Sequence, residues 1–308
     1  MFLIRPAMLV LLLSIAAAAQ PVKQSTIANG DESSPSELIG TNSVSYQRTT
    51  IDVNNISMRL RNDGLTGLNG KGYYPSRSNI TILFNGGLAI SGLVNGDIRT
   101  AWNVRWPYLV HELLPGRLGD DPNDPLLRFY HVSATDTFGS ENYLKWSNAV
   151  ELGAAFQDLD NDGNYNPWVD RPDILGDYSV WCVYNDGSSL AQRQWLETLP
   201  LGIDIQQTVW AYAGSGDLGD ILFLRYKLIN RSGEFIDSMM FSAWADPQSG
   251  YWEDDRVGSS VDRQTSFVYN SGPDNNYGIN PPAFGVRLLQ GPIIDAPGEV
   301  AYSYRGEY

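Results

Sequence analysis

Short runs of aliphatic, aromatic and β-branched residues, each ended by Gly, Asn, Asp or Pro, recur from about residue 46 to the end of the chain. In the clearest run, residues 221–229, apolar residues occupy alternate positions while Arg225 and Lys227 lie between them. This two-residue period is typical of a strand with one buried face. Its repetition between turn residues predicts an all-β fold, an antiparallel β-sandwich with long acidic loops.

The neighbouring segments extend this pattern. Residues 202–212 are predicted to form the preceding strand, and residues 236–245 the following one, with Met239, Phe241 and two alanines on its apolar face. Further strands are expected at 80–84 and 88–94, with tight turns at Asn85-Gly86-Gly87 and at residues 95–96, because Asn and Gly tolerate positive φ. Helical periodicity is scarce, and only residues 190–196 favour a short helix.

The turn-rich segment 115–125 suggests a boundary between an N-terminal β region, 46–118, and a β-sandwich region, 126–308. Two packed β-domains and one sandwich with a long loop both fit this pattern. At the other end of the chain, residues 300–304 resemble a strand that only four residues follow. This favours a chain that is truncated at its C-terminus.

The first 19 residues have the pattern of a secretory signal. Arg5 precedes an apolar stretch, residues 8–19, which ends in four alanines before Gln20, a suitable cleavage site. A membrane anchor is the alternative, but the stretch is short of the ~20 apolar residues that a spanning helix needs. No later segment has that length and apolarity. The signal therefore predicts secretion, followed by a flexible leader at 20–45 that is poor in large apolar groups.

The charge balance argues against nucleic acid as a partner. The chain has 21 basic and 35 acidic residues, and removal of residues 1–19 changes the net charge from −14 to −15. Such an acidic chain repels phosphate backbones. The lone Cys182 excludes an intramolecular disulfide, and its apolar surroundings favour a buried, unreactive thiol.

The sharpest local motif is the segment DLDNDGNYNPWVD at residues 158–170. Acids at loop positions 1, 3 and 5 and a glycine at position 6 are typical of a calcium loop, in which three carboxylates converge on one hard cation. Position 12 is Val169 where an EF-hand has glutamate, and Pro167 opposes a helical exit. We therefore expect a calcium loop between β-elements, with an ion shell of Asp158, Asp160, Asp162, Asn164, Asn166 and Asp170. An Asp-rich turn without an ion is the alternative.

A second acidic group lies further along the chain. Asp246, Asp254, Asp255 and Asp262 are candidate ligands for another calcium, with a solvated acidic loop as the alternative. Asp173 and Asp177 are close enough in sequence to add ligands to the first loop.

No motif selects catalytic residues. His111-Glu112 begins like a zinc helix motif, but Pro115 stands where the second histidine belongs. His131 lies in a strand-like run and is expected to be a hydrogen-bonded structural imidazole. A glycoside hydrolase needs only two carboxylates, which no spacing here selects. Trp168 and Trp252 near turns are candidates for stacking on sugars, although packing is the commoner role of aromatic residues.

Several ordered motifs between residues 60 and 292, among them LFNGGLAISG at 83–92, FQDLDNDGNYNP at 156–167, PLGIDIQQ at 200–207 and WAD at 244–246, resemble large secreted proteins of the Bacteroidetes and Ignavibacteria type. Such proteins usually end in a C-terminal sorting domain of the type IX secretion system, which is not visible in this sequence. The resemblance implies export to the cell surface and supplies no biochemical activity.

Together these observations predict an exported, calcium-binding structural or adhesive β-protein of the extracellular space or outer cell surface. Its expected partners are calcium and either surface glycans or other surface proteins. The alternative is a carbohydrate-binding module or a glycoside hydrolase.

Overall fold

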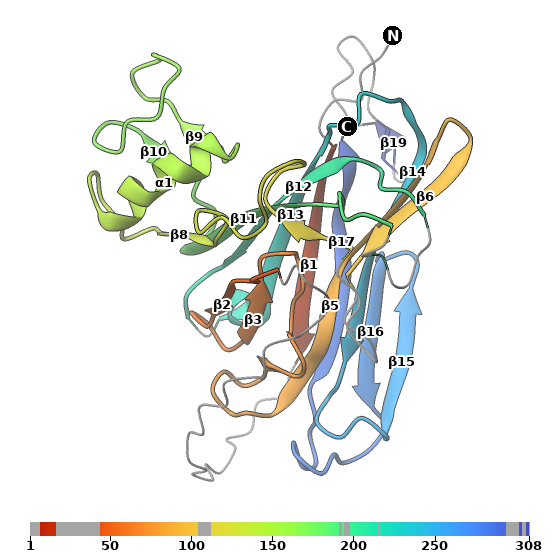
Figure 1. Ribbon diagram of the computed structural model, residues 1–308. Coiled ribbons are helices and arrows are strands. Elements are labelled where there is room, and N and C mark those ends of the chain that lie inside the picture. Colours follow the sequence, from red (N-terminus) through yellow and green to blue (C-terminus); the bar gives the residue numbers. More distant parts are fainter. Residues whose placement is uncertain are drawn as a thin grey trace.

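The computed structural model describes residues 7–16, 44–103, 112–190, 193, 198–214, 216–293, 302–303 and 306–307, with the backbone alone at 7–16 and in the last two segments. The regular structure in this part of the chain is mainly antiparallel β-strand in two large sheets, and the main core lies between them (Figure 1). The predicted all-β, sandwich-like fold is therefore confirmed.

The larger sheet contains nine strands within the described residues. Eight follow the order β15-β16-β17-β1-β13-β12-β11-β7, and β8 also pairs with β11. Their bounds are β15 Asp255–Ser260, β16 Thr265–Asn270, β17 Ala283–Ile293, β1 Ala7–Ala16, β13 Ile221–Asn230, β12 Ile203–Ala211, β11 Tyr178–Asn185, β7 Leu114–Pro115 and β8 Tyr130–Ser133.

The second sheet has the order β14-β5-β4-β3-β2, with β6 paired to β5. Its strands are β14 Ile236–Pro247, β5 Thr81–Val94, β4 Gly72–Tyr73, β3 Ser57–Arg61, β2 Arg48–Ile51 and β6 Asp97–Trp102. The remaining elements are the strand pairs β9 Phe156–Gln157 with β10 Arg171–Pro172 and β18 Tyr302–Ser303 with β19 Gly306–Glu307, the helix α1 Glu141–Glu151 and the 3₁₀ turn η1 Asp217–Asp220.

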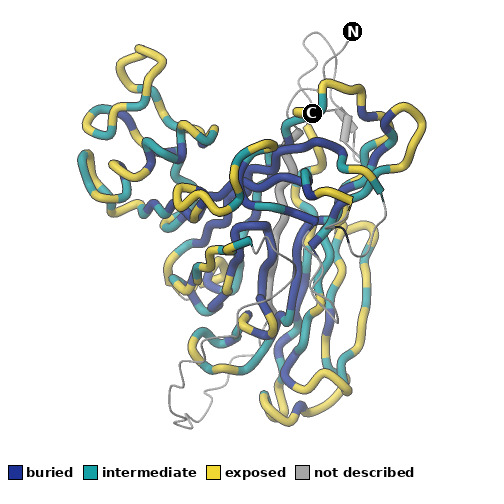
Figure 2. Tube along the Cα trace, viewed as in Figure 1, coloured by how far each residue is buried: buried dark blue, intermediate teal, exposed yellow. Residues whose placement is uncertain are grey.

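The core fills the space between the sheets, as the dark central strands in Figure 2 show. Leu224 and Tyr226 of β13 are buried from one side, and Ile82 and Ile90 of β5 from the other. The core takes residues from both regions predicted on either side of residues 115–125, Ile51 and Phe284 among its members. Burial of this continuous apolar layer is the main contribution to stability.

The strands predicted at 202–212, 221–229 and 236–245 form β12, β13 and β14, and alternate residues of β13 are buried. The predicted turn at residues 85–87 is wrong, because β5 runs unbroken from Thr81 to Val94. Gly86 instead permits a close approach: a Cβ there would lie 2.9 Å from Thr66 Oγ1. The turn at Asn95-Gly96 is confirmed, with φ of 53° and 87° between β5 and β6.

The helix α1 was missed by the sequence prediction. The segment predicted as helical, 190–196, lies mostly outside the described residues, whereas α1 begins after Ser140, whose side chain caps the Tyr143 N–H. Its apolar face is narrow, with three buried residues among eleven. Nowhere in the described part of the chain is there a helix with the length and apolarity to cross a membrane.

Strand β1 belongs to the segment predicted to be a secretory signal. It lies between β13 and β17 and pairs antiparallel with both (Figure 1). The larger sheet of the intact chain is therefore continuous only because residues 7–16 occupy this position.

Candidate functional site

The predicted calcium loop lies on an excursion of the chain, residues 134–177, which leaves the larger sheet after β8 and returns at β11. The excursion is anchored by a second apolar cluster in which Trp146 of α1 packs against Trp181 of β11, with ring centroids 6.4 Å apart. The Trp146 Nε1–H also donates to the Ala155 carbonyl at 3.1 Å. This cluster fixes α1, and through it the loop, on the outer face of the sheet.

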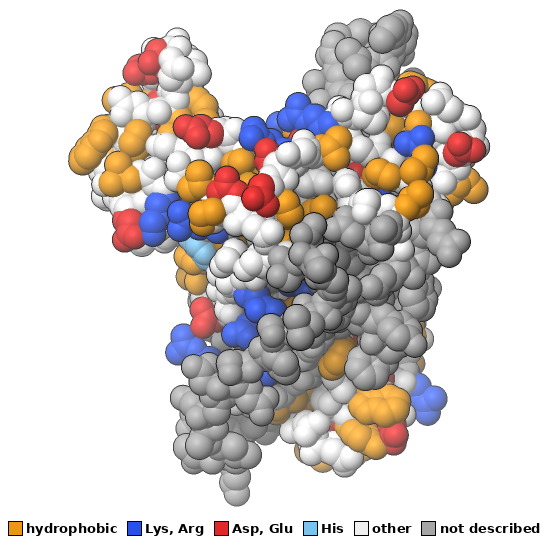
Figure 3. All heavy atoms as spheres, in the orientation of Figure 1, with side chains coloured by type: hydrophobic (Ala, Val, Ile, Leu, Met, Phe, Trp, Pro, Cys, Tyr) orange, Lys and Arg blue, Asp and Glu red, His pale blue; other side chains and the backbone are white. Residues whose placement is uncertain are grey.

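Residues 158–170 connect the two short strands β9 and β10 of this excursion. Arg171 pairs with Gln157 and Pro172 with Phe156, so a two-residue ladder closes the loop at its base. The prediction that the loop lies between β-elements is confirmed. Acidic side chains gather at the outer end of the excursion in Figure 3.

Three carboxylates converge within this loop. Asp158, Asp160 and Asp162 each offer one oxygen, and these oxygens lie within 4.8 Å of one another. Asn161 and Gly163 have φ of 59° and 82°, which bends the backbone sharply between and after the acids. The Gly163 N–H donates to Asp158 Oδ2 at 2.8 Å, which fixes the first carboxylate. The three acids that the sequence motif predicts to converge are thus close together in the structure.

Asp158 and Asp160 have pKa values that are shifted in opposite directions. The hydrogen bond from the Gly163 N–H is the main cause that lowers the pKa of Asp158. Partial desolvation, followed by the nearby charge of Asp162, raises the pKa of Asp160. Of these two carboxylates, Asp160 therefore gains more from a neutralising cation.

Asp170 is buried beneath the loop and anchors both of its ends. Its Oδ1 accepts from the Leu159 N–H at 2.8 Å, and its Oδ2 accepts from the Asn166 N–H at 2.7 Å. It does not belong to the set of three mutually close carboxylates. We therefore assign Asp170 first to the framework of the loop; each of its oxygens retains a second lone pair.

The two asparagines of the predicted shell order the second half of the loop. The Asn164 N–H donates to Asp162 Oδ1 at 2.7 Å, and Asn166 Oδ1 accepts from the Trp168 N–H at 3.1 Å. Trp168 is 65% exposed. Its ring lies over Gly139, where a Cβ would come within 2.1 Å, so the loop rests against the start of α1.

Asp173 and Asp177, the possible additional ligands, are engaged elsewhere. Asp173 Oδ2 accepts from Arg225 Nη2 of β13 at 2.6 Å, which ties the excursion to the sheet. Asp177 Oδ2 accepts from the Ala213 N–H at 2.9 Å. Both residues support the excursion.

The second acidic group is spread over the β14–β15–β16 region. Asp254 and Asp255 are adjacent at the start of β15, whereas Asp262 lies in the turn beyond its other end, roughly 20 Å along the strand. Asp246 pairs with Asn85 in the β14–β5 ladder, where burial raises its pKa. The four residues predicted as a second calcium shell therefore do not share one place.

Sequence reasoning missed Asp274, whose charge acts on Asp255, one of these four acids. It is buried and accepts from the backbone N–H groups of Tyr251, Asn276 and Tyr277 at 2.6–2.7 Å. Desolvation raises the pKa of Asp255, with further contributions from the charges of Asp254 and Asp274. No sequence signal distinguished Asp274 from other loop acids, because its role depends on two loops that meet in space.

Cys182 and His131 have structural roles. Cys182 is buried, and desolvation raises the pKa of its thiol, as the sequence predicted. His131 Nδ1 lies 2.7 Å from the Tyr178 hydroxyl and Nε2 lies 3.3 Å from Thr49 Oγ1, which confirms the prediction of a hydrogen-bonded imidazole. His111 lies outside the described residues, and Glu112 Oε2 accepts from the Trp102 N–H at 3.2 Å.

A second feature missed by sequence reasoning is a buried polar network at Asp186. Its carboxylate accepts from three successive backbone N–H groups, those of Leu201, Gly202 and Ile203, and Arg193 Nη2 lies 3.6 Å from Asp186 Oδ2. Arg193 also donates to backbone carbonyls, including that of Thr100 at 2.8 Å. These groups are mutually satisfied and hold the entry to β12, which is a structural role.

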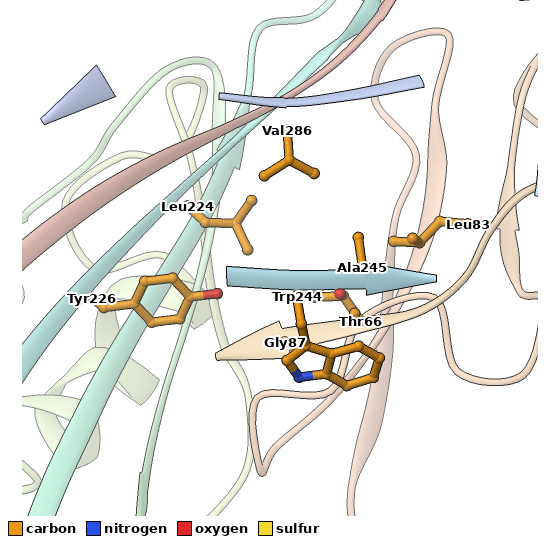
Figure 4. Close-up of a pocket in the computed structure, with 9 residues that line it drawn as sticks. Thr66, Leu83, Gly87, Leu224, Tyr226, Trp244, Ala245 and Val286 are labelled. Atoms are coloured by element: carbon orange, nitrogen blue, oxygen red, sulfur yellow. The ribbon is translucent and has the colours of Figure 1, made fainter. Parts of the chain in front are cut away.

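The pocket between the sheets shown in Figure 4 is a packing gap. Leu224 and Tyr226 of β13 and Val286 of β17 face Leu83 and Ala245 of the second sheet across it, whereas the Trp244 ring points away. The space inside is about 10 Å³, which is at most enough for one water molecule. It offers no room for an organic ligand.

No protein-family model, curated protein or solved structure matches this chain. Functional inference therefore depends on the geometry of the acidic loop and on the sequence itself.

Proposed function

We propose that this chain is an exported β-protein whose loop 158–170 binds calcium, and that it has a structural or adhesive role in the extracellular space or at the outer cell surface. The observation that supports the calcium site is the convergence of Asp158, Asp160 and Asp162, one oxygen of each within 4.8 Å of the others. Like charges at this spacing repel unless a cation lies between them, and carboxylate oxygens are the ligands that calcium prefers.

The surroundings of the loop favour a cation over an empty turn. The β9–β10 ladder and the Asp170 anchor hold the backbone, so the carboxylates need little further ordering to bind. The Asn164 carbonyl, the Asn166 side chain, Asp170 or water would complete the six to eight oxygens of a calcium shell. A calcium site of this kind would stabilise the fold and order a surface loop that can take part in adhesion. Neither role requires acid–base chemistry.

Export is supported by the signal pattern in residues 1–19 and by the resemblance to secreted surface proteins. N-terminal sequencing of the protein from a culture medium or cell envelope tests it. A mature chain that begins at or near Gln20 supports the proposal. A chain that retains Met1 in the cytoplasm contradicts it.

The calcium site is tested by thermal unfolding of residues 20–308 in millimolar calcium and in excess chelator. Calcium at a hundred times its dissociation constant adds about 2.7 kcal/mol to the free energy of unfolding. In a chain of this size, that raises the unfolding midpoint by roughly 4–5 °C. The variant Asp160→Asn should lose this rise, because it removes one ligand charge at nearly constant volume.

The matched control is Asp97→Asn, a change of the same kind at an exposed position in the β5–β6 hairpin. It should keep the full response to calcium. Identical unfolding curves of the parent chain with calcium and with chelator would overturn the assignment. A response that Asp160→Asn retains would place the ion elsewhere.

A carbohydrate-binding role is the second candidate, and the exposure of two indole rings favours it. Trp168 is 65% and Trp252 is 63% exposed, on separate parts of the surface. Exposed rings of this kind stack on sugar faces. Binding on a glycan array that Trp168→Ala or Trp252→Ala abolishes would support this function. Absence of binding to all glycans would leave the structural or adhesive proposal.

A further inference from the structure

The larger sheet depends on a strand that export would remove. β1 pairs with β13 on one side, Leu11 opposite Leu224, and with β17 on the other, Leu13 opposite Val286. If residues 1–19 are cleaved, β13 and β17 are left about 10 Å apart, two strand spacings, each with a row of unpaired backbone groups. We call this position between β13 and β17 the strand slot.

The slot requires a strand with one apolar and one polar face. On β13, Leu222, Leu224, Tyr226 and Leu228 are buried toward the core, while Arg225 and Lys227 lie on the other face. On β17, the exposed Arg287 alternates with the half-buried Val286 and Leu288. A sheet with one face toward the core and one toward solvent needs the same alternation in every strand.

β1 does not have this alternation. Its sequence, AMLVLLLSIA, is apolar at almost every position. The register therefore sets Met8 opposite Lys227 and Val10 opposite Arg225, while Leu12 is opposite Arg287 of β17. The apolar sequence of residues 7–16 is typical of a secretory signal, and it does not suit the solvent-facing positions of this slot.

Residues 299–308 of the same chain do have the required alternation. The sequence EVAYSYRGEY places Val300, Tyr302 and Tyr304 at one set of alternate positions and Glu299, Ser303, Arg305 and Glu307 at the other. The segment has ten residues, the same length as β1 and β13. In the intact chain its described parts, β18 and β19, pair only with each other within the described residues.

The topology also brings this segment to the slot. β17 ends at Ile293, whose partner in β1 is Met8. Residues 294–298, IDAPG, contain the Pro-Gly signal of a tight turn and have a length common in β-hairpins. A hairpin across this loop is antiparallel to β17, runs in the direction of β1, and places Glu299 where Met8 lies, beside Lys227.

We infer that, once the signal, residues 1–19, is removed, residues 299–308 of the same chain enter the strand slot between β13 and β17 and restore the larger sheet. In this register Val300 and Tyr302 face the core beside Tyr226 and Leu224, and Ala301 lies beside Arg225. This inference depends on the removal of residues 1–19 included in the proposed function and is independent of the calcium site. Strand exchange, in which a second copy supplies the segment, is the competing outcome.

Hydrogen–deuterium exchange of the chain that starts at Gln20 tests the inference directly. Peptides from β13 and β17 should be protected in the chain 20–308 and exchange at least tenfold faster in the chain 20–293. Tyr302→Asp with Tyr304→Asp should lose the protection, because these changes place charge on the core face. The matched control, Ala301→Asp with Ser303→Asp, changes the outward positions and should retain it.

Equal protection of β13 and β17 in the 20–293 chain would overturn the inference. So would protection in 20–308 that disappears on dilution as a dimer dissociates, since the strand would then come from a second copy. If the shortened chain fails to fold, a disulfide test in 20–308 decides the matter. Ala301→Cys should form a disulfide with Arg225→Cys, because the two residues are neighbours in the proposed register. It should not form one with Ser259→Cys on the distant strand β15, which is the control. Absence of a disulfide with Arg225→Cys would reject the proposed register.

The same exchange experiment separates this inference from the proposed function. It starts from residue 20 and is run in calcium and in chelator, and peptides that cover residues 158–170 report on the ion site. Loss of the calcium effect with a protected slot contradicts only the calcium proposal. An unprotected slot with a calcium-ordered loop contradicts only the strand inference.

Discussion

The carboxylate of Asp170 accepts a hydrogen bond from the Leu159 N–H at 2.8 Å, across eleven residues of chain. Its other oxygen accepts from the Asn166 N–H, so one buried side chain sets the shape of a loop whose exposed acids are the candidate calcium ligands. The framework of the loop and its ion-binding groups are thus different residues, and they can be tested separately.

Replacement of Asp170 should destabilise the protein whether or not calcium is present. Asp170→Ala leaves the N–H groups of Leu159 and Asn166, whose bonds to Asp170 are partly buried, without their charged acceptor, which costs about 2 kcal/mol in free energy of unfolding. Urea unfolding in chelator measures this loss. Asp160→Asn should show almost none of it under the same conditions, and an unchanged midpoint for Asp170→Ala would contradict the anchoring role.

Calcium affinity should fall as the pH is lowered, and the protonation of Asp160 should contribute to the fall before that of Asp158. The pKa of Asp160 is raised by partial desolvation and by Asp162, whereas that of Asp158 is lowered by the Gly163 N–H. As the pH falls, Asp160 is therefore protonated before Asp158 and its ligand charge is lost. Calorimetric titration over a series of pH values checks this, and an affinity that is constant through the acid range would refute it.

Without calcium the two acids should affect folding in opposite directions. Asp158, with a lowered folded-state pKa, stabilises the fold above its unfolded-state value, and this contribution is lost as the pH falls through the folded-state pKa. Asp160, with a raised pKa, opposes folding above that pKa, and this cost disappears as the pH falls through it. Chelator-treated Asp158→Asn and Asp160→Asn should therefore differ from the parent chain with opposite signs.

His131 should make the fold sensitive to mild acid. Burial, together with the charge of Lys145, lowers its pKa below the ordinary value of 6.5. The unfolded chain therefore takes up the proton first, and stability falls as the pH drops from about 6.5 toward the lower folded-state pKa. In urea unfolding, His131→Gln should make the free energy of unfolding less dependent on pH in this range. The same slope in both proteins would exclude His131 as the cause.

Two glycines with similar backbone angles allow strain and crowding to be separated. Gly67 has φ of 80° and Gly96 has φ of 87°, but a Cβ at Gly67 would lie 2.9 Å from the carbonyl oxygens of Leu83 and Phe84, while a Cβ at Gly96 meets nothing within 4 Å. Gly96→Ala should cost about 1 kcal/mol from the left-handed conformation alone. Gly67→Ala should lower the free energy of unfolding by clearly more in the same assay. An equal loss for the two variants would show that the backbone of β5 shifts to accommodate the added Cβ.

The sequence by itself determined the features that depend on local periodicity and spacing. Alternation in residues 221–229 predicts the half-buried strand β13, because successive side chains of a strand point to opposite faces. The positions of Asp158, Asp160 and Asp162 before Gly163 predict three converging carboxylates, because a sharp turn brings near neighbours together. The Asn95-Gly96 hairpin is predictable for the same reason.

Only the tertiary structure decided the features that depend on contacts between distant segments. Gly86 reads as a turn residue but lies inside β5, because the approach of Thr66 and the β14 backbone leaves no room for a side chain. Asp274 and Asp186 gain their roles from backbone N–H groups that other loops or strands deliver. The slot between β13 and β17 is invisible in the sequence, because strand order is set by which edges meet across the whole sheet, and local pattern carries no information about that.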